Sequence, residues 1–353
     1  MDAQNVFPKR LRNARVMRGL SAQELCDKAG GVVTRQAVSK YEKGQCMPDS
    51  RVLLALCEAL AVKPDYLFRP FGCKIGDIHY RKLSKLNKGD LKSINMVVED
   101  EVERLLEAEM LCAVECSFKS VLKEYQIESA DDVAEAAARL RQEWNVGNDA
   151  IRSVTDMLEN NGVLVVEVDA PKGFSGLNGT LDSGRPVIVV NKNMAVERKR
   201  LTALHELGHA LLQFDESVDE KMQEGLCNAF ANEVLIPREV LIKLLGSRRH
   251  DIAVVELRNL QQEYGISIDA LMYKAKSVGV ISSNRYEVFC KKKNSNWELR
   301  AAIEQSVYKD EHSSKRLENL VYKALADGII STSKAAELLN VEVEEVLGEF
   351  VLA

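Results

Sequence analysis

Residues 201–212, LTALHELGHALL, place two histidines and a glutamate within an apolar pattern of helical spacing. Residues four positions apart lie on one face of a helix, with Cβ atoms about 5–6 Å apart. His205 and His209 can therefore bind one ion together, while Glu206 projects beside them. The segment predicts a zinc site on a helix, and the rest of the chain has to fold so that this site is completed.

A zinc ion in a hydrolase usually takes three protein ligands and leaves one position for water, so a third ligand is expected from another segment. Glu224 is predicted as this ligand because it lies early in the next expected helix. Asn228, four residues further on, is expected to orient a histidine ring without binding the metal. Glu233 is the alternative third ligand, although it lies over two turns away near Pro237.

These groups predict a zinc metalloendopeptidase of the HExxH type. Zinc lowers the pKa of its bound water and polarises a carbonyl, and Glu206 is expected to pass the water's proton to the departing amine. The β-type runs before the helix offer a sheet edge to which an extended peptide can bind. Tyr264 and Tyr273 are candidates for stabilising the oxyanion, but buried packing is the more common role of a tyrosine.

The composition excludes a membrane protein. Of the 353 residues, 46% are hydrophobic and 29% are charged, and no apolar run approaches the roughly 18 residues of a membrane helix. The first ten residues lack the apolar region of a signal peptide, and the eight cysteines include no C-x-x-C pair. We therefore expect a cytoplasmic protein with reduced thiols and no membrane partner.

The net charge of −5 conceals an asymmetry along the chain. Residues 1–70 carry 12 Lys and Arg against 7 Asp and Glu, whereas the remaining residues carry 36 against 46. A cationic segment on an acidic chain is expected where one end binds phosphates and the rest does not.

Residues 7–68 have the pattern of four or five short helices, because apolar residues recur at three- and four-residue spacing between Gly and Pro breaks. Ser21 and Glu24 form a capping box at the start of one helix, and Thr34 caps the next. This arrangement predicts a helix-turn-helix domain.

The helix after Thr34 is predicted to enter the major groove of DNA. Arg35 and Gln36 occupy its first turn and Lys40 lies one turn further, so Arg and Gln are expected to contact guanine and adenine edges. Candidate phosphate contacts are the basic residues Lys9, Arg10, Arg15 and Lys43. The expected partner is a double-stranded operator, bound by a homodimer.

The whole chain predicts a mainly α fold with a small β-sheet (α+β). Residues 129–161 resemble two helices, three β-type runs follow, and helices continue from the HELGH segment to the C-terminus. We expect an N-terminal helix-turn-helix domain at 1–70, a helical connector at 71–128 that forms a helical hairpin or a dimer seam, a zinc peptidase domain at 129–290 and a C-terminal helical region at 291–353.

A second helix-turn-helix pattern, GIISTSKAAELLNVEVEEV, lies near the C-terminus. It carries Glu342, Glu344 and Glu345, which repel phosphates. A structural or protein-contact role is therefore expected for this segment.

With both ends described, residues 7–68 resemble the XRE (Cro/C1-type) helix-turn-helix family, and about residues 130–280 resemble the ImmA/IrrE family of zinc metallopeptidases. The second resemblance rests on GFSGLNGTL, PVIVVNKN, LTALHELGHALL and EGLCNAFANEVLIP, in that order. It implies a zincin-like domain in which His205, His209 and Glu224 bind zinc and Glu206 is the base. It also implies cleavage of an XRE-type repressor, which relieves repression in stress responses or phage defence.

The chain departs from this family pattern because its own XRE domain is fused to the peptidase. The target is therefore a separate XRE-type repressor, the fused domain, or neither, and single-stranded DNA or another stress signal is the expected activator. The alternative function is a non-proteolytic XRE repressor or antitoxin-like regulator that uses the peptidase fold as a ligand sensor. The intact Glu206 favours the enzyme, because a sensor needs no base beside the metal.

Overall fold

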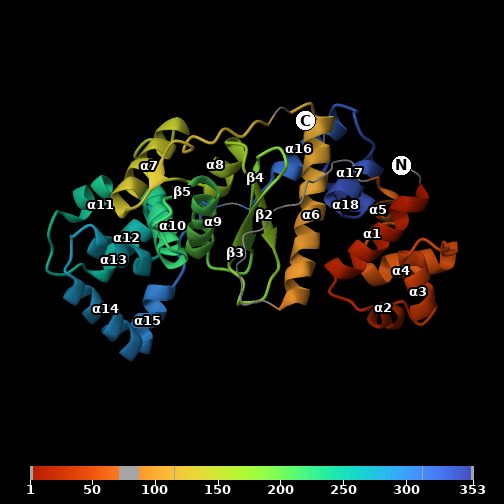
Figure 1. The fold of residues 1–353 in the computed structure, drawn as a ribbon, viewed down its shortest axis with the longest axis horizontal. Coiled ribbons are helices and arrows are strands. Elements are labelled where there is room, and N and C mark those ends of the chain that lie inside the picture. The colour runs from red at the N-terminus through yellow and green to blue at the C-terminus, as the bar shows by residue number, and fades with distance from the viewer. Residues whose placement is uncertain (1–2, 71–86, 115, 312, 351–353) are drawn as a thin grey trace. The chain divides into compact units, whose positions relative to one another are not determined.

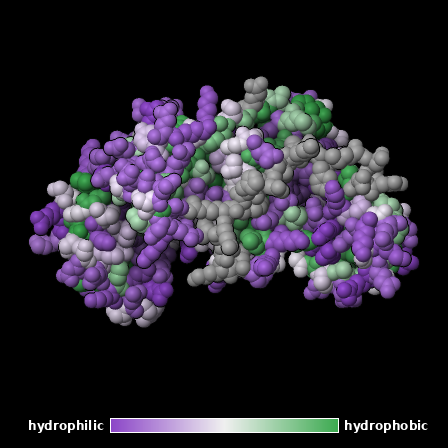
Figure 2. All heavy atoms as spheres, viewed as in Figure 1, coloured by the Kyte–Doolittle hydropathy of each residue, from purple (hydrophilic) through white to green (hydrophobic). Residues whose placement is uncertain are grey.

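The computed structural model describes residues 3–70, 87–114, 116–311 and 313–350 (Figure 1). The described chain forms two compact units: the first contains the residues up to 116 and those from 315 onward, and the second contains residues 117–314. Figure 2 shows hydrophilic residues over most of the visible surface. Within the described residues, no helix combines the length and the apolar character needed to cross a membrane.

The first unit begins with five helices around one apolar core: α1 (Ala3–Met17), α2 (Ala22–Lys28), α3 (Arg35–Glu42), α4 (Ser50–Leu60) and α5 (Pro64–Phe68). The core contains the buried side chains of Phe7, Leu11, Leu25, Val38 and Leu56. Both predicted caps are present. Ser21 and Glu24 form the capping box of α2, and Thr34 Oγ1 accepts from the Ala37 backbone N–H at 3.2 Å.

The predicted connector contributes one long helix, α6 (Lys88–Leu111), to the same unit. Its apolar residues Ile94, Val98, Val102 and Leu105 are buried, and the helix packs against α1 and against α16 (Arg316–Ala326). These contacts lie within one chain, and α6 forms no helical hairpin within the described part of the connector; a dimer seam stays a prediction. The prediction missed that a segment over 200 positions further along the sequence covers this helix.

Three C-terminal helices complete the first unit: α16, α17 (Thr332–Leu339) and α18 (Val343–Glu349). Arg316 pairs with Glu109 of α6 at 2.9 Å, and Lys334 pairs with Glu107 at 2.7 Å. A small core of Val321, Ala335, Leu338 and Val346 joins the three helices. The unit is therefore discontinuous in sequence, and residues 117–314 form an insertion between α6 and α16.

The second unit is built on a three-stranded sheet with the order β2 (Leu164–Val168), β4 (Pro186–Asn191) and β3 (Gly176–Thr180). β2 is parallel to β4, with Val166 opposite Val189, whereas β3 is antiparallel to β4. Every residue of β4 is buried, which explains its continuous apolar sequence PVIVVN. Two residues each from β1 (Gln126–Ile127) and β5 (Gln213–Phe214) form a separate parallel pair.

The helices of this unit are α7 (Ala130–Glu143), α8 (Val154–Asn160), α9 (Val196–Leu211), α10 (Glu220–Leu235), α11 (Arg238–Leu245), α12 (Val254–Tyr264), α13 (Ile268–Ser277), α14 (Ser283–Ser295) and α15 (Trp297–Glu304). α9 packs against β3 and β4, and α10 packs against α9 and α7 (Figure 1). The predicted mainly α fold with a small β-sheet is thus confirmed.

Buried ionic contacts fix the first half of α9. The Arg200 side chain is 1% exposed, pairs with Glu311 and donates to the Ile151 carbonyl at 2.6 Å. Glu311 also accepts from the backbone N–H groups of Val154 and Thr155 at the start of α8. Because a buried guanidinium with these partners has little freedom to move, α9 is a rigid support for the residues on its second half.

Candidate metal centre

α9 and α10 approach each other closely at Gly208. A Cβ at this position would lie 3.2 Å from Cδ1 of Phe230 and 3.4 Å from Sγ of Cys227. A larger residue would therefore push α10 away from α9. The close approach lets Glu224, in the second turn of α10, reach the histidines of α9.

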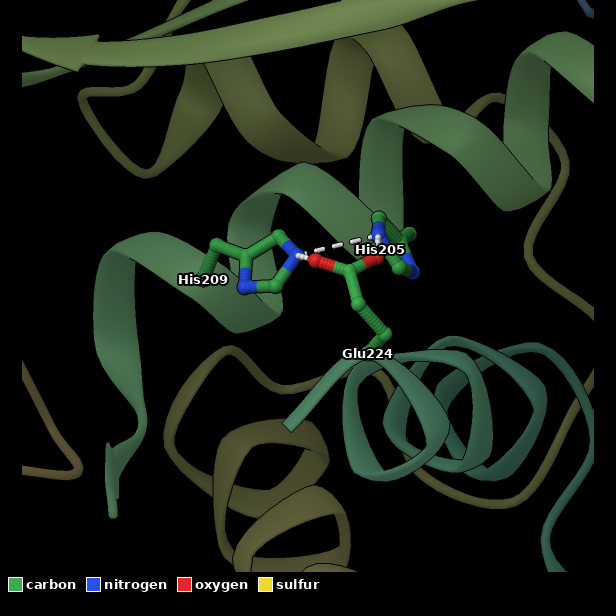
Figure 3. Close-up of side chains that lie close together, drawn as sticks. All are labelled: His205, His209 and Glu224. Atoms are coloured by element: carbon green, nitrogen blue, oxygen red, sulfur yellow. Dashed lines mark hydrogen bonds and ion pairs between the residues drawn. The ribbon is translucent and has the colours of Figure 1, made fainter. Parts of the chain in front are cut away.

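The structure brings His205, His209 and Glu224 together, as Figure 3 shows. The two Nε2 atoms are 3.0 Å apart. Glu224 places Oε1 at 3.1 Å from Nε2 of His209 and Oε2 at 3.3 Å from Nε2 of His205. Three potential ligand atoms thus converge on one point from two helices.

This cluster has the donor set and dimensions of a metal site. Ligand atoms of a tetrahedral zinc ion with bonds of about 2.0–2.1 Å lie about 3.3–3.4 Å from one another, close to the observed separations. Two imidazoles and a carboxylate are typical ligands of catalytic zinc. Among the described residues, no other group of three or more His, Cys, Asp and Glu side chains has ligand atoms that all lie within 4.8 Å of one another.

Glu206 lies beside this cluster and is only 4% exposed. Asn178 of β3 donates from Nδ2 to Glu206 Oε2 at 2.7 Å. β3 comes this close because of Gly176, where a Cβ would lie 2.7 Å from Cγ2 of Thr202 and 2.8 Å from the Val189 carbonyl oxygen. The sheet therefore supports the glutamate directly.

The ring of His209 is held from its other nitrogen. Nδ1 lies 3.1 Å from Sγ of Cys227, and the His209 side chain is fully buried. Asn228 was predicted to orient a histidine, and the structure corrects this: its side chain is exposed and donates to the Glu224 backbone carbonyl at 2.8 Å. The reason is the rotation of α10, which turns Cys227 towards α9 and Asn228 towards solvent.

Glu233, the alternative third ligand, takes part in other contacts. Its Oε1 pairs with Nζ of buried Lys274 at 3.0 Å, and its Oε2 accepts from the Arg238 backbone N–H at 2.9 Å. Burial lowers the pKa of Lys274 to about 8, an effect that Glu233 opposes. These partners place Glu233 in the packing of α10 against α13, outside the histidine cluster.

In the first unit, α3 presents a polar outer face. Arg35, Gln36 and Lys40 are exposed, whereas Val38 is buried in the core of the unit. The exposed cations Lys9 and Lys43 lie on α1 and at the end of α3. This geometry leaves one side of α3 accessible to a groove.

Two separate regions of the chain match family models. Residues 11–67 match a helix-turn-helix family, and residues 158–276 match a peptidase family described as the IrrE N-terminal-like domain. The chain carries a helix-turn-helix domain and an IrrE-like peptidase domain. The second match contains all residues of the cluster on α9 and α10.

Each curated relative is similar to one of these two regions. The peptidase domain is similar to the radiation response metalloprotease IrrE of Deinococcus radiodurans, with 32% identity over 80 residues, 19% of this chain and 24% of that protein. The IrrE of Deinococcus deserti is 34% identical over 80 residues, 19% of this chain and 28% of that protein. The helix-turn-helix domain is similar to the SPbeta prophage-derived HTH-type transcriptional regulator YonR of Bacillus subtilis, with 38% identity over 64 residues, 18% of this chain and 57% of that protein.

The matched regions therefore span between about a quarter and somewhat more than half of these relatives. A metallopeptidase family implies a bound metal, and a helix-turn-helix domain implies DNA binding.

Two predicted phosphate contacts of the helix-turn-helix domain are corrected by the structure. Arg10 is 2% exposed, and both terminal nitrogens donate to Glu103 of α6 at 2.6 Å. Arg15 is half-buried and donates to both oxygens of Glu42 on α3, at 2.5 and 2.9 Å. Both guanidinium groups join helices inside the unit, so they are not available to a DNA backbone.

The two tyrosines considered for the oxyanion lie in different surroundings. Tyr264 is 5% exposed, and burial raises the pKa of its hydroxyl. Tyr273 is 47% exposed and its ring packs edge-on against Tyr286 at 6.0 Å. The described contacts place neither of them at the histidine cluster.

Two residues of the site, Asn178 and Cys227, were not predicted, although each has a weak signal in the sequence. Asn178 is a polar residue in the middle of a strand whose neighbours on both sides are buried, a position where an amide needs a partner. Cys227 lies three residues after Glu224, on the same face of the expected helix. Neither signal could be interpreted without knowing which segments lie opposite.

Proposed function

We propose that the chain is a transcriptional regulator whose peptidase domain hydrolyses a peptide bond, with a zinc ion held by His205, His209 and Glu224. The observation that carries this proposal is the buried Glu206 carboxylate beside the three-ligand cluster, oriented by Asn178 at 2.7 Å. A binding site without chemistry has no use for a buried base at this position. The similarity to proteins named radiation response metalloprotease supports the same activity.

The bound zinc would supply a polarised carbonyl and an acidified water. The residues of the chain then have distinct tasks. Glu206 accepts a proton from the attacking water and returns it to the departing amine, while Asn178 keeps the carboxylate in one orientation. Cys227 and the burial of the His209 ring hold that imidazole in place.

The proposed substrate is an extended segment of a regulatory protein. β3 lies at the edge of the described three-stranded sheet and provides Asn178, so a strand added along this edge would pass close to Glu206. A partner XRE-type repressor or the chain's own helix-turn-helix domain is the proposed target. Single-stranded DNA or another stress signal is the proposed activator of a homodimeric, cytoplasmic regulator bound to its operator.

The test uses wild type and Glu206→Gln. Each is incubated alone and with the XRE-type repressor encoded nearest to its gene, with and without single-stranded DNA, and fragments are followed by mass spectrometry. The amide still accepts from Asn178 but cannot take a proton, so Glu206→Gln should retain zinc and operator affinity and lose cleavage. Absence of fragments in every wild-type sample, together with operator affinity that responds to a ligand at the zinc site, would favour the sensor instead.

A further inference from the structure

A small open pocket lies between α1 and α6 in the first unit, apart from the outer face of α3. It has a volume of about 370 Å³ and is lined by Lys9, Arg12, Asn13 and Val16 of α1 and by Lys92 and Met96 of α6. Half of this lining comes from cationic side chains, and no carboxylate contributes to it. We call it the α1–α6 pocket.

The three cations of this pocket differ from the other arginines on α1. Arg10 and Arg15 are matched with Glu103 and Glu42, and Arg18 donates to the Leu60 and Ala61 carbonyls. Over the described part of the chain, the side chains of Lys9, Arg12 and Lys92 are exposed and take part in no ion pair or hydrogen bond. Positive charge in the α1–α6 pocket is therefore uncompensated, while the charge on the neighbouring turns of the same helix is compensated.

Clustered like charges repel one another, and a bound anion removes this repulsion. Lysine and arginine together suit phosphate, because the guanidinium offers two parallel donors and the ammonium a compact charge. The carboxamide of Asn13 adds a neutral donor, and Val16 and Met96 provide a short apolar wall. The volume falls at the lower end of small-molecule sites, which is sufficient for a phosphorylated metabolite.

The position of the pocket separates it from the predicted reading of bases. α1 contacts α3 through Arg15 and Glu42, whereas the pocket lies where α1 meets α6. α6 lies outside residues 11–67, the region that matches the helix-turn-helix family. Lys92 and Met96 are therefore additions to that domain, specific to the way in which this chain continues.

We propose that the α1–α6 pocket binds a phosphate group with at least two negative charges, held by Lys9, Arg12 and Lys92. Two sources share this chemistry: a free phosphorylated small molecule, and the backbone of DNA that extends beyond the operator. A ligand here would join the helix-turn-helix domain to α6, which already contacts α1 through Arg10 and Glu103. Occupancy of the pocket would thereby stabilise the packing on which α3 rests.

The test is calorimetric titration of the full chain with inorganic pyrophosphate at low salt, for wild type and for Arg12→Gln/Lys92→Gln. The control, Lys28→Gln/Lys119→Gln, removes the same charge from exposed positions outside the pocket. Wild type and control should bind about one pyrophosphate per chain, and the pocket variant should bind at least about tenfold more weakly. Thermal unfolding of all three proteins checks that the substituted side chains leave the fold intact.

A second arm identifies the source of the phosphate by measuring the affinity for a long random duplex. If pyrophosphate and the duplex bind without competing with each other, the ligand of the pocket is a free phosphorylated molecule. Loss of duplex affinity in the pocket variant relative to the control, without pyrophosphate binding, indicates the DNA backbone. The proposal is overturned if the pocket variant and the control agree in both measurements.

Discussion

Asn178 donates a hydrogen bond to Glu206 at 2.7 Å and so connects the edge strand β3 to the helix that carries both histidines. The contact joins two segments that lie 28 positions apart in the sequence. It gives the proposed base a fixed orientation that α9 alone does not provide.

Replacement of Asn178 by Ala should lower kcat roughly 10–100-fold and leave KM and zinc content near their wild-type values. The carboxylate loses its orienting donor, but the metal ligands keep their positions. Asn193→Ala, at an exposed residue whose amide contacts Asp169, is the matched control. An unchanged kcat in Asn178→Ala would show that Glu206 needs no support from β3.

Glu224→Ala should lose most of its zinc, because one of three ligands is removed, whereas Glu233→Gln should retain about one zinc per chain. Metal analysis of the dialysed proteins measures both. The structure places Glu233 on Lys274 and Arg238, so its substitution should affect stability alone. Full zinc retention in Glu224→Ala would exclude it as the third ligand.

Arg35→Ala and Gln36→Ala should each reduce the preference for operator over random duplex by about 1–3 kcal/mol. Lys43→Ala should weaken binding to both duplexes, because a phosphate contact carries no sequence information. The slope of the logarithm of affinity against the logarithm of salt concentration should fall in magnitude by about 1. Titrations at two salt concentrations separate these effects. Equal specificity in all variants would contradict the assignment of α3 as the recognition helix.

Arg10→Met should lower the free energy of unfolding by about 3–5 kcal/mol, because Glu103 remains buried without its main partner. The double variant Arg10→Met/Glu103→Leu should recover much of this loss, since it removes both charges. Denaturant unfolding measures the cycle. A lower salt slope of DNA binding in Arg10→Met, with unchanged stability, would restore Arg10 as a phosphate contact.

Lys274 predicts a rise of stability with pH. Burial lowers its pKa to about 8 in the folded protein, against about 10.4 in an unfolded chain. Between these values the unfolded chain holds a proton that the folded chain has lost, so the free energy of unfolding increases with pH. Between pH 8 and pH 10, the free energy of unfolding of wild type should rise by about 2 kcal/mol relative to that of Lys274→Met. Denaturant unfolding at several pH values measures it, and a difference between the two proteins that does not change with pH would contradict the lowered pKa.

Local features of the fold could be predicted because they depend on neighbours in sequence. The caps at Ser21 and Thr34 need only residues three positions apart, and the apolar run 186–191 is sufficient to indicate a buried strand. The spacing of His205 and His209 belongs to the same class, because one helix determines it.

Contacts between distant segments could not be predicted in this way. The sequence shows that Arg10 is basic, but only the packing of α6 shows that Glu103 neutralises it. The same limit applies to Asn228 and Cys227, since the rotation of α10 against α9 decides which of them reaches a histidine. A side chain's role depends on what lies opposite, and periodicity does not contain that information.

The split of the first unit into two stretches of sequence affects the order of events on the ribosome. α6 can pack against α16 only after the ribosome has synthesised residues 117–314, which takes about 10–40 s at typical elongation rates. An mRNA that is truncated within the peptidase coding region therefore yields a helix-turn-helix segment that lacks α16, α17 and α18. Translation itself thus ensures that a fully assembled DNA-binding unit is always joined to a complete peptidase domain.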